Sequence, residues 1–75
     1  MKKNYEHYYT LSWATTGKDG RTRHYSRHLD NLDKAISTAR KIAEKPETKL
    51  SKIRELESWD EGPVTHVSLI GFVQY

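Results

Sequence analysis

Residues 8–29 read YYTLSWATTGKDGRTRHYSRHL and predict two strands joined by a turn. Aromatic and leucine side chains occupy alternate positions within Tyr8–Thr15, which is typical of a half-buried strand. The segment Gly17–Gly20 supplies glycines that accept positive φ and an aspartate that can bond its own backbone. Thr22–Leu29 is then the returning strand of a hairpin rich in aromatic and basic residues.

A helix is predicted directly after this hairpin, over about Leu32–Glu44. Asn31 is a suitable N-cap, and Pro46 ends the helix because it lacks the amide that a further turn would use. Apolar residues recur at the helical period and form one stripe: Leu32, Ala35, Ile36, Ala39, Ile42 and Ala43.

The last third of the chain predicts a second hairpin. Residues 50–58 fit either a helical turn or a strand over Lys52–Ser58, and we favour the strand because it pairs naturally with the β-prone residues at the end of the chain. Asp60–Pro63 has the composition of a turn, and Val64–Tyr75 is β-prone. Both faces of this last strand are expected to be apolar, with Val67, Leu69, Val73 and Tyr75 on one and Val64, Ile70 and Phe72 on the other.

Together these segments predict a single α+β domain over residues 1–75 with the order ββαββ: a four-stranded antiparallel sheet with one helix packed on one face. A helix of this length is about 20 Å long and about 10 Å wide, so it covers one side of the sheet only. The other side is expected to face water or a partner.

Composition narrows the class of protein. A chain of 75 residues buries only about 60% of the surface that its unfolded form exposes, which argues against a deep active-site cleft. It contains no cysteine, and its most apolar stretch, Leu69–Val73, is far shorter than the roughly 20 residues of a membrane span. We therefore expect a soluble, cytoplasmic protein.

The charges are segregated along the chain. Residues 1–54 carry all 13 Lys and Arg against 6 acidic residues, whereas residues 55–75 carry 4 acidic residues and no Lys or Arg. Two surfaces of opposite potential would favour a polyanion at one and a basic partner at the other, while a solvated surface of uneven sign explains the pattern equally well.

No residue spacing predicts catalysis, a cofactor or a metal. On a strand, His24 and His28 would lie about 13 Å apart, too far to share one ion. The acids near the second hairpin are expected at its exposed end, and neither a nucleophile turn nor a phosphate loop occurs. We expect a protein that is not an enzyme and binds no cofactor.

The sharpest binding hypothesis is a row of side chains on the second strand. Arg23, Tyr25 and Arg27 share one parity with Arg21, so they leave the same face of the sheet. On the uncovered face they would bind phosphates and stack bases. Alternatively, Tyr25 and Leu29 point into the core and the arginines lie at the edge. The candidate contacts for a partner or nucleic acid are Tyr8, Lys18, Arg21, Arg23, Tyr25 and Arg27.

A second candidate surface lies on the last hairpin. Ile70 and Phe72 are expected on the face opposite Val67, so one apolar set should lie away from the helix and contact a partner or a second copy of the chain. Trp59 could anchor such a contact or be partly buried against the hairpin.

The segment Tyr9–Lys45, with its Gly17–Gly20 turn, basic strand and Leu32-Asp33-Lys34-Ala35-Ile36 helix opening, resembles the AP2-like amino-terminal domains of phage integrases. That resemblance implies a sheet laid on DNA. The chain departs from the family by placing two strands after the helix, where the family has three before it.

In size, lack of cysteine and ββαββ order the whole chain is similar to small accessory proteins of phages and mobile elements, including some anti-CRISPR inhibitors. The likeness implies a stoichiometric inhibitor that covers a functional surface of a host protein or ribonucleoprotein complex, with a homodimer also possible. Direct binding of DNA or RNA through the basic hairpin is the alternative.

Overall fold

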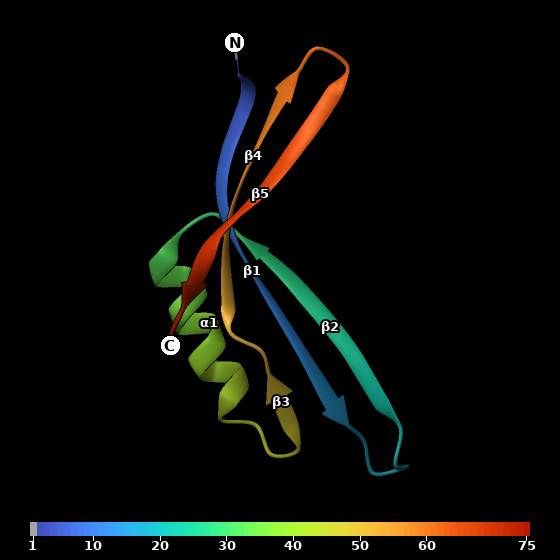
Figure 1. The fold of residues 1–75 in the computed structure, drawn as a ribbon. Helices are drawn as coiled ribbons and strands as arrows, with labels where there is room; N and C mark the ends of the chain where they lie inside the picture. The colour runs from blue at the N-terminus through green and yellow to red at the C-terminus, as the bar shows by residue number, and fades with distance from the viewer. Residues whose placement is uncertain (1) are drawn as a thin grey trace.

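The computed structural model describes residues 2–75, which form five strands and one helix (Figure 1). In chain order these are β1 (Lys3–Thr16), β2 (Thr22–Leu29), α1 (Leu32–Ala43), β3 (Thr48–Leu50), β4 (Ile53–Glu61) and β5 (Val64–Val73). The chain is α+β, as predicted. None of the described helices is long and apolar enough to cross a membrane.

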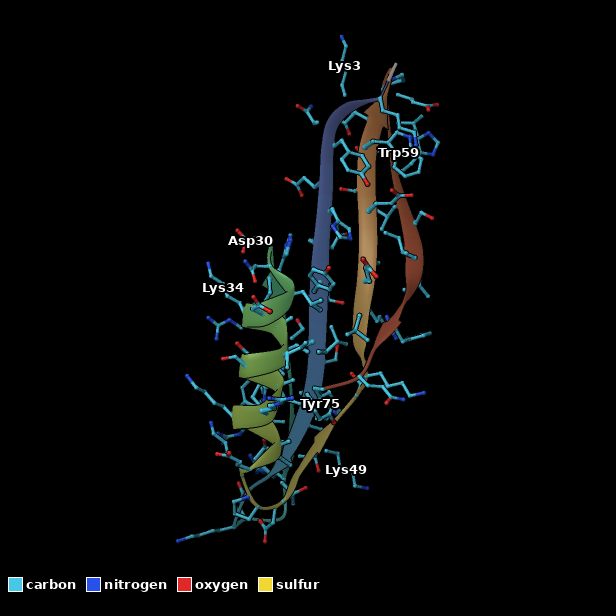
Figure 2. All side chains as sticks on the ribbon, turned by 90° about the vertical axis from the view of Figure 1, so that its left-hand side faces the viewer. Lys3, Asp30, Lys34, Lys49, Trp59 and Tyr75 are labelled. Atoms are coloured by element: carbon cyan, nitrogen blue, oxygen red, sulfur yellow. The ribbon has the colours of Figure 1, made fainter. Side chains whose placement is uncertain are left out.

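One antiparallel sheet with the order β2-β1-β4-β5 forms the body of the molecule. Strand β1 pairs along its second half with β2 on one side, while β4 and then β3 lie along its other side. The result is an elongated body of 50 × 24 × 15 Å. We call residues 9–53 the head and residues 3–8 with 56–69 the arm; α1 runs beside the head only (Figure 2).

The helix forms where the sequence predicts it. The Asn31 side chain accepts hydrogen bonds from the backbone amides of Asp33, at 2.8 Å, and Lys34, at 3.2 Å. These bonds satisfy two amides that the first turn leaves without helical partners. The helix ends at Ala43, one residue before the predicted end.

The core lies between α1 and one face of the head. Its buried residues are Tyr9, Leu11, Leu29, Ala35, Ala39, Ile42 and Ile53. Tyr9 and Leu11 are alternate residues of β1, and Leu29 lies opposite Tyr9, so this core fixes which face of each strand points at the helix. The expectation that one helix covers only one side of the sheet is confirmed.

Two details of the predicted sheet are wrong. The sheet has a fifth strand, because β1 extends beyond the end of β4 and Thr48–Leu50 pairs with Trp13–Thr15 there. The predicted first strand, Tyr8–Thr15, is also too short, since β1 begins at Lys3. The strand favoured over Lys52–Ser58 is confirmed as β4.

The predicted faces of the last strand are correct for Val64, Val67 and Leu69 and wrong beyond Leu69. Leu69 lies opposite Leu56 and Gly71 opposite Glu55, so Ile70 is an extra residue in a β-bulge. The bulge reverses the parity beyond it. Phe72 therefore lies on the same face as Leu69 instead of the opposite one, and Val73 lies opposite the core residue Ile53.

Candidate functional site

The sheet face away from α1 carries an apolar patch on the arm and on the adjoining part of β5. The patch consists of Tyr8, Leu56, Val67, Leu69 and Phe72. Tyr8, Leu56 and Leu69 lie side by side on three adjacent strands, and Phe72 lies two pairs nearer the head, opposite Arg54. Val67 is 60% exposed and Phe72 58% exposed. Such a cluster on an open sheet face is typical of a contact surface.

The same face changes character over the head. Strands β2, β1 and β3 form a shallow, open cavity of about 630 Å³ whose lining includes Ser12, Ala14 and Ser26. Ala14 lies between His24 on β2 and Lys49 on β3 in the sheet register. The short side chains let a partner approach the sheet closely. The positive charge of Lys49 beside them favours a partner that is negatively charged.

The arginine row lies on the other face. Tyr25 lies opposite Trp13, and their rings stack at 5.7 Å between centroids, while Arg27 lies opposite the core residue Leu11. The hypothesis that Arg23, Tyr25 and Arg27 share the uncovered face is therefore wrong. Burial of Leu29 against the helix fixes the parity of β2 and turns these residues to the helix side, where they remain exposed.

Three further predicted contacts do not join that row. Tyr8 lies on the uncovered face, where its ring lies 4.4 Å from that of His28. Lys18 and Arg21 belong to the exposed hairpin turn, and the Arg21 guanidinium lies 3.9 Å from the Asp19 carboxylate. The predicted set is thus divided between two faces and a turn.

Trp59 and Phe72 also lie on opposite faces. Trp59 lies opposite His66 on the helix side of the arm, with its ring stacked on the imidazole at 5.5 Å. Its indole nitrogen donates to Glu61 at 3.2 Å, and Lys2 Nζ lies 4.1 Å from the ring centroid. The partial burial predicted for Trp59 is confirmed, whereas Ile70 is 50% exposed at the bulge.

A polar ladder that the sequence analysis missed crosses β1 and β4 on the helix side. Tyr5 donates to Glu57 at 2.7 Å, and His7 Nε2 lies 2.6 Å from Glu55. The hydrogen bond to Glu57 raises the pKa of Tyr5, because it favours the neutral phenol. The spacing of Tyr5, His7 and Tyr9 at every second position was the available signal, but its interpretation needed the pairing partner on β4.

Within residues 2–75, no group of three or more His, Asp and Glu side chains is placed to hold a metal ion. Comparison with known protein families, with curated proteins and with solved structures found no match.

Proposed function

We propose that the protein is a non-enzymatic binding protein, of the type found in phages and mobile elements, that covers and inhibits a host protein or nucleoprotein complex. One observation carries this proposal. The uncovered sheet face is apolar on the arm and carries short polar side chains and Lys49 on the head. One face of the sheet therefore presents two chemistries along a body 50 Å long.

The two sections suit the two components of a nucleoprotein. The apolar patch gains free energy when a protein surface removes it from water. The head carries ten Lys and Arg against five acidic residues, and the arm carries one against four. Phosphates are therefore attracted to the head, while protein contact falls to the arm. A target with apolar and phosphate surfaces side by side would engage both at once.

Affinity capture with variants on the two faces tests the proposal. Tagged protein should recover a defined protein or nucleoprotein complex from the host lysate in stoichiometric amount. Recovery should fall at least tenfold for Phe72→Ser and for the pair His24→Glu and Lys49→Glu, all on the uncovered face. The matched control, Arg23→Glu with Arg27→Glu, lies on the helix side and should have a smaller effect. Equal loss for both pairs, or recovery of bulk nucleic acid alone, would overturn the proposal.

Direct binding of DNA or RNA is the second candidate, and the cavity over β2, β1 and β3 favours it. Its short side chains beside Lys49 would admit a phosphate backbone. Binding of a generic duplex should then weaken steeply with salt, with a log–log slope of about −0.9 per phosphate neutralised on B-DNA. Salt-independent or undetectable binding at low ionic strength would reject this candidate.

A further inference from the structure

The outer edge of β5 is the part of the molecule best suited to pair with another strand. Among residues 2–75, only β4 pairs with β5, so the backbone amides and carbonyls on its other side are free over ten residues. We propose that this edge pairs, antiparallel, with β5 of a second copy of the chain. The proposal does not depend on the proposed function.

The free edges of the sheet differ in charge. Proteins keep exposed edges from pairing with charged residues, especially lysine, or with proline. The edge of β2 carries Arg23 and Arg27, and β3 carries Lys49. The edge of β1 that extends past β2, on the side away from β4, carries Lys3. Strand β5 contains no Lys, Arg, Asp, Glu or Pro. It is thus the edge that lacks these protecting residues.

Strand β5 is also where exposed apolar surface gathers. The large hydrophobic residues exposed on it are Val64, Val67, Leu69, Ile70 and Phe72, each at least half exposed. Burial of such side chains stabilises an association by about 25 cal/mol per Å² of apolar surface, before the cost of association is deducted. Edge pairing would bring the apolar patches of two copies together into one surface.

Charge favours a second copy as the occupant. Strand β5 runs from the arm tip at Val64 towards the head at Val73. An antiparallel pair centred near Val67 therefore sends the two basic heads to opposite ends. The acidic arm tip of each copy then lies beside the end of β5 that is nearest to the basic head of the other copy. The association brings unlike charge together and keeps the like-charged heads apart.

A cysteine at the centre of the pair tests the geometry, because the chain contains no native cysteine. Directly opposed residues of antiparallel strands have Cα atoms about 4.5–5.5 Å apart, which is within disulfide range. Val67→Cys should therefore give covalent dimers under mild oxidation. The matched control Ser26→Cys lies on the β2 edge and should remain monomeric under the same conditions.

Light scattering and sedimentation equilibrium test the association itself. The unmodified chain should be a dimer at high micromolar concentration, and Val67→Lys or Thr65→Lys should raise the dimer dissociation constant at least tenfold. Both positions are exposed in one copy, and circular dichroism should report an unchanged fold. Ser26→Lys is the control and should leave the dimer intact.

Three results would overturn the proposal. The first is that the chain stays monomeric at all concentrations. This result overturns the proposal even if the β5 edge binds an extended segment of another protein. The second is a dimer that survives both lysine substitutions. The third is cross-linking through Ser26→Cys but not through Val67→Cys. Capture of a host target is measured separately, so either proposal can fail without the other.

Discussion

The head and the arm share strand β1 but are stabilised differently. All seven buried hydrophobic residues of the described chain lie in the head, and no residue of the arm is buried. The reason is geometric: α1 has 12 residues and spans about 18 Å, against a body 50 Å long. The arm depends on backbone pairing, cross-strand contacts and partly buried side chains, so a partner would stabilise the arm more than the head.

The largest expected effect comes from truncating a leucine in each region. Leu11 is fully buried under the helix, so Leu11→Ala should lower the free energy of unfolding by about 2–5 kcal/mol. Leu69 is half exposed on the arm, and Leu69→Ala should cost less than about 1 kcal/mol. Urea unfolding of both variants, at concentrations that hold any self-association constant, measures the difference. Similar losses would mean that the arm contains a core of its own.

A smaller contrast separates a cap in the head from a turn in the arm. Asn31→Ala removes both hydrogen bonds to the first helical turn and should lower global stability by about 1 kcal/mol. Gly62 has a φ of +58°, so Gly62→Ala should impose a backbone cost of about 1–2 kcal/mol. No atom lies within 4 Å of the added Cβ, so that cost is conformational and local.

Hydrogen exchange and urea unfolding together distinguish the local effect of Gly62→Ala from the global effect of Asn31→Ala. Gly62→Ala should speed amide exchange near the arm tip while the midpoint of urea unfolding moves little, because the tip can open without exposing the core. Asn31→Ala should shift the midpoint. A Gly62→Ala variant whose midpoint falls as far as that of Asn31→Ala would show that head and arm unfold as one unit.

The head was predictable because its local signals agree with its packing. An N-cap, an apolar stripe at helical period and a proline mark α1, and alternation with a glycine turn marks β1 and β2. The arm was less predictable. Asn4 has a φ of 53° at a register shift, which interrupts the alternation at the start of β1. The bulge at Ile70 then reverses the parity on which facing predictions depend.

The candidate site shows the same limit. That one face would be left uncovered was predictable from the length of the helix, a property that the sequence determines directly. Which side chains occupy that face depends on the long-range register that buries Leu29 beside Tyr9. Local parity alone could not supply that register. The face of the arginines was therefore left open between two alternatives, and Ser12, Ala14 and Lys49 were overlooked.

The smallest expected effect is electrostatic and is confined to the arm tip. The Asp60 carboxylate accepts hydrogen bonds from Asn4 Nδ2 at 2.8 Å and from Thr65 Oγ1 at 2.7 Å. Both bonds lower the pKa of Asp60 from its ordinary value of 3.8, because they favour the charged form, and the bond from Asn4 has the larger effect. The resulting stabilisation is present above the ordinary carboxyl pKa and is lost as the pH falls through the lowered folded value.

The side-chain amide of Asn4 should report this titration by nuclear magnetic resonance, with a midpoint below the ordinary carboxyl value of 3.8. Asp60→Asn should abolish the transition, and Glu61→Gln, beside it on β4, should preserve it. The stability difference between the wild-type chain and Asp60→Asn should shrink as the pH falls. A midpoint at or above 3.8 would mean that Asn4 does not tie β1 to the arm tip in solution. The start of β1 would then be held to β4 by backbone pairing and by the side-chain contacts of Tyr5 and His7.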